Sequence, residues 1–171
     1  MDNDTVVRDT VVRDTVNLDG ASPAASAVRP ARDGYRWDGV ASMQYKQDGS
    51  APFKDISRQV LFEDPALQCQ LRYFEMGDGG YSTLERHEHA HAVMILRGHG
   101  QCLVGQEIRD VGPHDLINIP AWTWHQFRAN AGEAFGFLCM VNHERDRPVL
   151  PTEADLAELC NTDRVRTFLG R

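Results

Sequence analysis

Histidine is concentrated in one part of this sequence. Six of the seven histidines lie between residues 87 and 125. The densest run starts at Glu85 and reads Glu-Arg-His-Glu-His-Ala-His. Residues two apart on an extended strand point to the same side, so the carboxylate of Glu85 and the three imidazoles of the run would share one face.

Three imidazoles and a carboxylate on one face predict a metal site. Burying such groups without partners is costly, so an apolar interior has no other reason to collect them. Imidazole and carboxylate together suit divalent first-row metals. We therefore expect one divalent metal ion per chain, iron or manganese first, with zinc, nickel, cobalt and copper as alternatives. The competing interpretation is a solvated stripe of histidines on the surface.

The elements that must position these side chains are short strands. Apolar or aromatic runs alternate with Gly, Pro, Asp and Asn turns from Trp37 onward, without intervening helical periods. Many short strands at close spacing are typical of an antiparallel sandwich or barrel. The expected strands are 56–62, 70–76, 93–96, 101–104, 107–111, 116–119, 125–128 and 135–141.

The two ends of the chain have different patterns. Residues 1–33 contain tandem Asp-Thr-Val-Val-Arg copies and an Ala/Ser/Pro-rich stretch, a composition that predicts a disordered tail. Residues 34–151 would form the β-barrel domain. In residues 152–171, Thr152 and Asp155 form a capping-box pattern ahead of apolar residues at helical spacing. We expect short C-terminal helices packed on the outside of the barrel.

Composition restricts the partners. A length of 171 residues suits one domain, and the formal net charge of -7 argues against nucleic acid or an anionic membrane as a partner. No apolar run is long enough to span a bilayer, and the acidic N-terminus lacks the pattern of a secretion signal. Four widely spaced cysteines then read as reduced thiols, so we expect a cytoplasmic protein.

The histidine run resembles the first motif of the cupin superfamily. That motif reads Gly, five residues, His-x-His, three or four residues, Glu, six residues, Gly, and Gly79 and Gly98 anchor the chain on it without a gap. Glu85 and His87 then occupy the two His positions, and His91 occupies the Glu position. The end ligands have exchanged identity, while the set remains one carboxylate with imidazoles.

The second cupin motif is matched less completely. It reads Gly, five residues, Pro-x-Gly, two residues, His, three residues, Asn. Pro120 and His125 fall on its Pro and His positions, whereas His114 and Trp122 replace the two glycines and Ala129 replaces the asparagine. These departures affect the turns and leave the ligand in place.

The resemblance covers about residues 70–142 and implies an all-β fold, a cupin jelly-roll β-barrel or sandwich with the metal inside. It implies Glu85, His87, His91 and His125 as ligands, most like small single-domain cupins that have a fourth histidine in the Glu position. An alternative remains for the fourth ligand. His89, which this register places in the loop between the two ligand strands, would bind the metal while Glu85 forms an ion pair.

The cavity around the metal is expected to be mainly aromatic and apolar, with walls from Val93, Ile95 and Trp124. Tyr81 and Thr83 share strand parity with Glu85, and Phe127 shares it with His125, so these side chains should face the cavity. An inward guanidinium of Arg72 would hold an anionic substrate, although a surface ion pair is equally compatible with Arg72. Cys139 is by default a small buried apolar residue, and its thiol is of chemical interest only if it lies near the metal. The expected substrate-binding residues are Arg72, Tyr81, Thr83, Phe127, Phe137 and Cys139.

Fold alone leaves the chemistry open. The first hypothesis is an oxidoreductase of the dioxygenase type acting on a small organic substrate, with Glu85 as metal ligand or general base. The alternatives are a non-oxidative isomerase or lyase that uses the metal as a Lewis acid, and a ligand-binding protein without turnover. The resemblance also implies a homodimer, and the strand residues 53–62 are a candidate for its interface.

Overall fold

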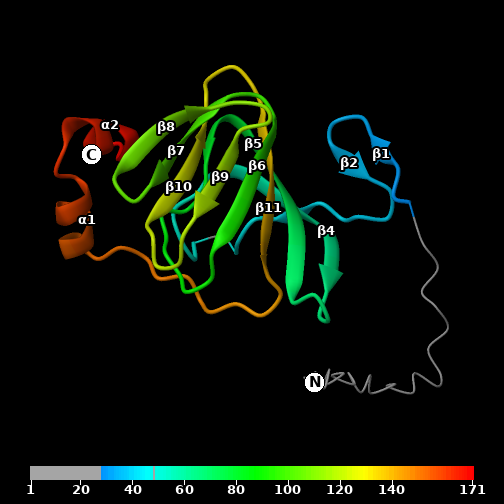
Figure 1. Ribbon diagram of the computed structural model, residues 1–171. Coiled ribbons are helices and arrows are strands. Elements are labelled where there is room, and N and C mark those ends of the chain that lie inside the picture. Colours follow the sequence, from blue (N-terminus) through cyan, green and yellow to red (C-terminus); the bar gives the residue numbers. More distant parts are fainter. Residues whose placement is uncertain (1–27, 48) are drawn as a thin grey trace, which may run out of the picture.

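A single curled antiparallel sheet dominates the structure. The computed structural model describes residues 28–47 and 49–171, and Figure 1 shows its sheet with the helices at one side. The sheet has nine strands in the order β8-β7-β10-β5-β11-β6-β9, with β4 on the free side of β5 and β3 beyond it. The all-β prediction is therefore confirmed.

All eight predicted strands are present, each within a few residues of its expected bounds. They are β4 (Lys54–Asp64), β5 (Cys69–Tyr81), β6 (His91–Arg97), β7 (Gly100–Val104), β8 (Glu107–Val111), β9 (Leu116–Ile119), β10 (His125–Ala129) and β11 (Phe135–Asn142). Three two-residue strands were not predicted: β1 (Ala31–Arg32), β2 (Arg36–Trp37) and β3 (Met43–Gln44). Such short pairings have too few residues to show a period-two pattern.

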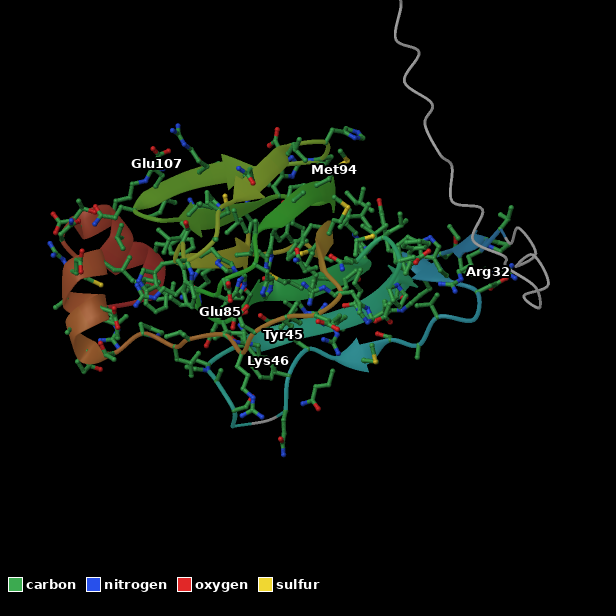
Figure 2. The ribbon with its side chains drawn as sticks, turned by 60° about the horizontal axis from the view of Figure 1, so that its bottom comes forward. Arg32, Tyr45, Lys46, Glu85, Met94 and Glu107 are labelled. Atoms are coloured by element: carbon green, nitrogen blue, oxygen red, sulfur yellow. The ribbon has the colours of Figure 1, made fainter. Side chains whose placement is uncertain are left out.

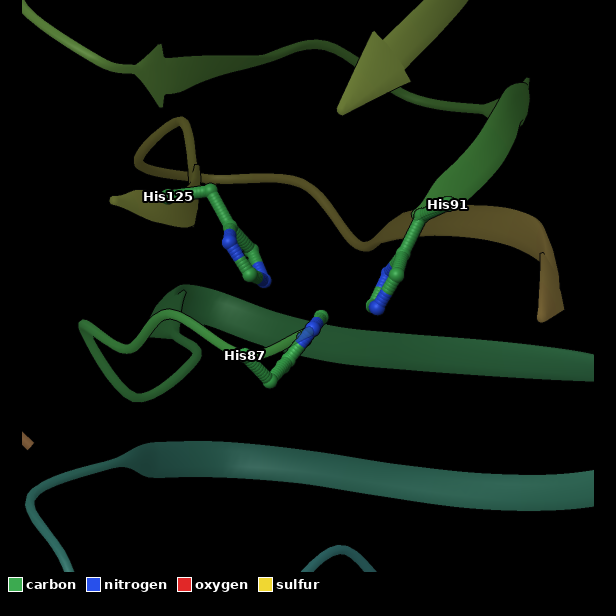
Figure 3. Close-up of side chains that lie close together, drawn as sticks. All are labelled: His87, His91 and His125. Carbon is green, nitrogen blue, oxygen red and sulfur yellow. The ribbon is translucent and has the colours of Figure 1, made fainter. Parts of the chain in front are cut away.

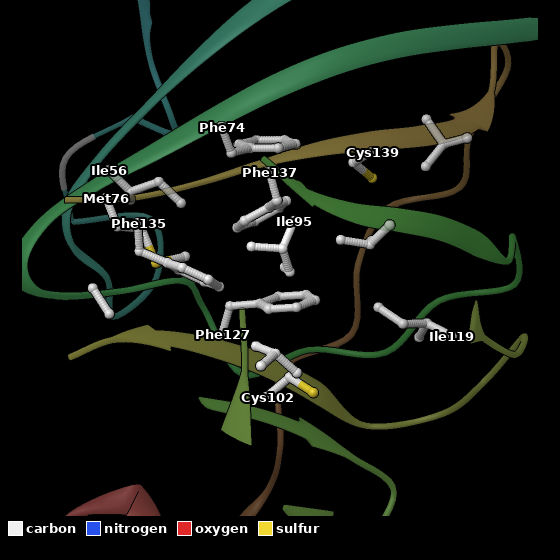
Figure 4. Close-up of a cluster of buried hydrophobic side chains, with 14 residues drawn as sticks. Ile56, Phe74, Met76, Ile95, Cys102, Ile119, Phe127, Phe135, Phe137 and Cys139 are labelled. Carbon is white, nitrogen blue, oxygen red and sulfur yellow. The ribbon is translucent and has the colours of Figure 1, made fainter. Parts of the chain in front are cut away.

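Register aligns the inner face of the sheet into rows. Cys139 of β11 lies opposite both Arg72 of β5 and Val93 of β6, and Phe137 lies opposite Phe74 and Ile95. Residues paired in this way share a face. Most of the inner face is apolar and forms the main core shown in Figure 4, but the row through Cys139 carries a cation and a thiol.

The segment before the barrel packs on its outer face. β1 and β2 form a small hairpin, and between them the ring of Tyr35 stacks on Tyr73 with centroids 5.7 Å apart. Trp37 meets the same ring edge-on at 5.2 Å. Of the predicted tail, residues 1–27 lie outside the described residues, while Ala31–Arg32 belongs to this hairpin.

Two short helices close the chain, α1 (Glu153–Leu159) and α2 (Asp163–Leu169). The predicted capping box at Thr152 and Asp155 is present, with both reciprocal hydrogen bonds formed. The buried helix residues pack with Trp124 and other barrel side chains in a second core. Trp124 therefore lies under the helices and is not a wall of the cavity, contrary to the prediction. Among the described residues, no helix is long and apolar enough to cross a membrane.

Candidate metal centre and cavity

Three histidines from three separate elements meet inside the barrel. His87 lies in the loop between β5 and β6, His91 is the first residue of β6, and His125 is the first residue of β10. Figure 3 shows their rings pointing toward one another. One ring nitrogen of each lies within 4.8 Å of those of the other two. Strand pairing thus brings together residues that are up to 38 positions apart, His87 and His125.

Backbone carbonyls fix the tautomers of two of these rings. Nδ1 of His87 donates to the carbonyl of His89 at 2.8 Å, and Nδ1 of His125 donates to the carbonyl of Thr123 at 2.9 Å. Nε2 of His87 and Nε2 of His125 are then unprotonated, and each has a lone pair that can bind a metal ion. Nε2 of His91 is buried and has no hydrogen-bond partner among the described residues. A histidine that ligates a metal through one ring nitrogen commonly donates its other ring N–H to a carbonyl or a similar acceptor, as His87 and His125 do here. The three rings therefore fit a metal ion.

Burial keeps the three rings neutral. Desolvation is the largest cause of each shift, and repulsion between the rings adds to it for His87 and His91. The pKa of His87 falls to about 4, and the pKa values of His91 and His125 are also lowered. A neutral imidazole is the form that binds a metal ion.

Glu85 is buried at the edge of this group. It forms a β-bridge with His125, and its carboxylate forms an ion pair with Lys46. Figure 2 shows Tyr45, Lys46 and Glu85 together on one side of the molecule. Glu85 lines the cavity but is not a member of the three-histidine group. Its assignment as the fourth ligand stays a prediction, and the ion pair is the arrangement weighed as its alternative.

His89 lies in the loop between the two ligand strands, where the motif register places it. Its ring stacks on His87 with centroids 3.7 Å apart, and its Nδ1 lies 2.7 Å from Oδ1 of Asp146. Desolvation alone would raise the pKa of Asp146, but hydrogen bonds from the Glu88 amide and the His89 ring lower it. His87, His89 and Asp146 form a second group with metal-binding geometry.

Cys139 lies between the histidines and a buried arginine. Its Sγ is 3.3 Å from Nδ1 of His91 and 3.6 Å from Nη2 of Arg72. Burial raises the pKa of the thiol, and the Arg72 guanidinium offsets part of that rise. If Nε2 of His91 holds a metal, the ring proton is on Nδ1 and donates to the sulfur. The metal-binding tautomer of His91 therefore favours a thiolate at Cys139.

These groups line one cavity of about 240 Å³, at the small end of the range for ligand sites. Its apolar wall includes Phe127 and Phe137, whose rings stack with centroids 4.6 Å apart. Five of the six expected substrate-binding residues line it: Arg72, Thr83, Phe127, Phe137 and Cys139.

Tyr81 and Ile95 lie outside the lining of this cavity. The ring of Tyr81 packs under the guanidinium of Arg128 at 4.8 Å. β5 ends at Tyr81, and the two residues that follow it, Ser82 and Thr83, both line the cavity. Parity carried from Glu85 back to Tyr81 fails because the alternation stops where the strand stops. Ile95 is fully buried in the core and does not reach the cavity.

Several lining residues were not predicted from the sequence. Tyr45 and Lys46 precede β4, Arg58 lies within it, and Arg145 and Asp146 lie after β11. Arg145 and Asp146 belong to a run of four charged residues, 144–147, whose composition is typical of a solvated loop. In the structure this loop lines the cavity, and Asp146 forms hydrogen bonds with the Glu88 amide and the His89 ring. No local pattern in the sequence indicates that contact.

Comparison with known proteins agrees with this architecture. The family model that matches, at residues 72–141, is described as a cupin domain. A cupin 2 conserved barrel domain protein from Rhodopseudomonas palustris is 62% identical, with a TM-score of 0.79 over 83% of this chain and 98% of the other. A cupin 2 domain-containing protein from Halorhodospira halophila is 38% identical, with a TM-score of 0.62 over 84% and 95% of the two chains.

One similar protein has a named activity. The 1-methylthio-D-xylulose 5-phosphate methylsulfurylase of Rhodospirillum rubrum is 60% identical over 141 residues, which are 82% of this chain and 90% of the relative.

Proposed function

The chain belongs to the cupin family, and from this premise we propose that it is a metal-dependent enzyme that transfers a methylthio group from a small phosphorylated ketose. The observation that carries the proposal is the meeting of three neutral imidazoles with a buried thiol in one small cavity. The activity named for the 60% identical relative supplies the substrate class.

His87, His91 and His125 would hold one divalent metal ion, with iron or manganese proposed first. A metal with an open position polarises a carbonyl oxygen and stabilises negative charge there. Glu85 remains a candidate fourth ligand or general base, provided that it leaves its ion pair with Lys46.

Cys139 is the proposed acceptor of the methylthio group. A methylthio group at carbon 1 of a 2-ketose is next to the carbonyl. The thiolate forms a bond to the methylthio sulfur, the bond from carbon 1 to sulfur breaks, and its electron pair stays on the sugar as an enolate. Protonation of carbon 1 gives a methyl ketone, and the protein retains a methyl disulfide at Cys139.

A second thiol must then restore the enzyme. A low-molecular-weight thiol attacks the methyl disulfide, leaves as a mixed methyl disulfide, and returns Cys139 to its reduced form. The overall reaction consumes one thiol for each sugar phosphate and needs no dioxygen. All four cysteines of the chain are free in the structure, which supports a reducing compartment such as the cytoplasm.

The dioxygenase hypothesis makes a different demand, because it requires dioxygen as a co-substrate. Methylthio transfer needs no dioxygen, so the requirement for dioxygen distinguishes the two reactions. The substrate in both experiments, with and without dioxygen, is 1-methylthio-xylulose 5-phosphate.

We would incubate the metal-loaded protein with this substrate and a small thiol, with and without dioxygen. We expect the dethiomethylated sugar phosphate and a mixed methyl disulfide in equal amounts under argon. The His125→Ala protein should lose bound metal and about 100-fold or more of the activity. The exposed His99→Ala protein should keep both, because His99 lies outside the cavity. Oxygen-dependent product, with none under argon, would favour the dioxygenase and reject the transfer.

A further inference from the structure

Three arginines line the same cavity as the histidines. Arg58 and Arg72 come from the neighbouring strands β4 and β5, and Arg145 comes from the loop after β11. Arg58 is paired with Phe74, and Val60 with Arg72, so the two arginines are diagonal neighbours on the inner face. We call these three residues the arginine cluster.

Within the described part of the chain, no carboxylate forms an ion pair with the arginine cluster, although the charge of Glu63, which pairs with His143, acts on Arg145. The two acidic residues of the cavity are already engaged, Glu85 with Lys46 and Asp146 with His89. Arg145 donates to two backbone carbonyls, those of Asn142 and His143. Nε of Arg58 and Nε of Arg72 are both buried and have no hydrogen-bond partner among the described residues.

This arrangement is costly unless a ligand compensates it. Desolvation, followed by repulsion from Arg72, lowers the pKa of Arg58, and the same causes with Arg58 added lower that of Arg145. Arg72 itself is only 8% exposed. Buried charges are normally paired, and unpaired buried donors destabilise the fold. Arg72 is buried and Arg58 is half-buried, each with an unpartnered Nε, and Arg145 lies beside them at the exposed end. Such a group of guanidiniums around one cavity is the arrangement expected of an anion site.

We propose that the arginine cluster binds the phosphate monoester of the substrate. The inference rests on the proposed function for its substrate class and adds the place where the phosphate lies. A phosphate monoester carries more than one negative charge near neutral pH and three acceptor oxygens. Arginine forks match those oxygens with paired hydrogen bonds. A carboxylate would neutralise only one of the three cations.

The position of Cys139 agrees with this assignment. The thiol lies 3.6 Å from Arg72 on one side and 3.3 Å from His91 on the other. A short sugar phosphate held at the arginine cluster would extend past the thiol toward the three histidines. The carbon chain between its two polar ends would lie along the apolar wall that includes Phe74 and Phe137.

Calorimetric titration of the metal-loaded full-length protein with inorganic phosphate at constant ionic strength tests the site. We expect Arg58→Gln and Arg72→Gln to weaken phosphate binding about tenfold or more. Arg58→Lys keeps the charge and loses the fork, so it should give an intermediate affinity and replaces Arg58→Gln if that variant is unfolded. Arg109→Gln is the matched control, since Arg109 is exposed on β8 and pairs with Glu107.

Two further arms identify where the anion binds. Acetate should bind more weakly than phosphate, and phosphate binding should persist after the metal is removed with a chelator. Binding that is lost with the metal and unchanged in Arg58→Gln would place phosphate on the metal and overturn the proposal. No measurable phosphate binding to the wild-type protein would also overturn it.

The same variants separate this inference from the proposed function. Phosphate binding that depends on the arginine cluster, without turnover of the methylthio sugar phosphate, would leave the anion site standing and reject the reaction. Turnover with unchanged KM in Arg58→Gln and Arg72→Gln would keep the reaction and reject the anion site.

Discussion

At the scale of single residues, two backbone carbonyls decide what the histidine group can do. The carbonyls of His89 and Thr123 accept the Nδ1 protons of His87 and His125, which leaves both Nε2 atoms unprotonated. The sulfur of Cys139 has the corresponding position at His91. The tautomer of His91 is therefore linked to the ionisation of the Cys139 thiol.

The lowered histidine pKa values predict acid sensitivity of the metal-free protein. The unfolded chain takes up a proton at His87 near pH 6.5, whereas the folded chain resists it until about pH 4. The unfolded state thus binds more protons in this window, so stability is complete above about pH 6.5 and falls as the pH falls toward 4. We expect the Tm, measured by calorimetry, to decrease over this interval.

Matched variants assign that pH dependence. His87→Gln should flatten the decrease in Tm between pH 6.5 and about 4, because one titrating group is removed. His99→Gln should leave it unchanged, since His99 is exposed. A Tm that is constant across this interval in the wild-type protein would contradict the burial of neutral imidazoles.

Cys139 gives a prediction that separates binding from chemistry. Cys139→Ser replaces the sulfur with an oxygen that can still accept the Nδ1 proton of His91. We expect the metal content, measured by elemental mass spectrometry, to stay near one equivalent per chain, while methylthio transfer falls by about 100-fold or more. Cys102→Ser is the control, because Cys102 is buried in the core away from the cavity. Unchanged turnover in Cys139→Ser would exclude Cys139 as the acceptor.

At the scale of elements, two loops enclose the site. The loop between β5 and β6 carries His87 and His89, and the segment after β11 carries Asp146. They are joined by the hydrogen bonds of Asp146 to His89 and to the Glu88 amide, and by a β-bridge between Arg86 and Val149. The chain after the last strand is therefore part of the cavity lining.

The turn between β6 and β7 sets where the β6 strand ends, and Gly98 is essential to it. Gly98 has φ +64°, and an added Cβ would lie 2.0 Å from the Ala134 carbonyl oxygen. Gly105 has the same φ, but its nearest neighbour would be a Thr123 methyl group at 3.8 Å. Gly105→Ala should therefore cost only the left-handed backbone, about 1–2 kcal/mol.

Gly98→Ala should add a steric cost of about 1–3 kcal/mol to that value, because backbone must move to remove the clash. The free energies of unfolding in urea give the comparison. Equal losses in the two variants would mean that the Ala134 carbonyl shifts without cost.

At the scale of the whole molecule, one end of the outer sheet face is covered and the other is open. The β1–β2 hairpin covers Tyr73. Beyond it, four large apolar side chains on β4, β6, β9 and β11 are more than a third exposed: Phe62, Met94, Leu116 and Met140. An exposed apolar surface of this kind is typical of an interaction site.

The homodimer stays a prediction, and Phe62 lies in the segment expected to form its interface. Phe62 is 44% exposed on β4. If a second copy covers this strand, Phe62→Glu should shift the mass measured by light scattering from dimer to monomer, because a buried unpaired carboxylate is costly. Glu107→Lys on the distant strand β8 should leave the mass unchanged. A monomeric wild-type protein would reject the prediction.

The sequence by itself determined the strands, the helix caps and the three imidazoles that the structure brings together. Strand alternation and capping are local patterns, and the spacing of His87, His91 and His125 follows the cupin motifs over short distances. The strands and caps could be predicted because each depends on residues close together in the chain, whereas His125, 38 positions after His87, was placed with the other histidines by its resemblance to the second cupin motif.

Only the tertiary structure decided what surrounds the histidines. Arg58 and Arg145 reach the cavity from β4 and from the last loop, and Lys46 takes the carboxylate of Glu85. Tyr81 turns away because its strand ends there. These contacts join segments far apart in the chain, and their partners are selected by packing and charge in the folded barrel, for which a local pattern has no signal.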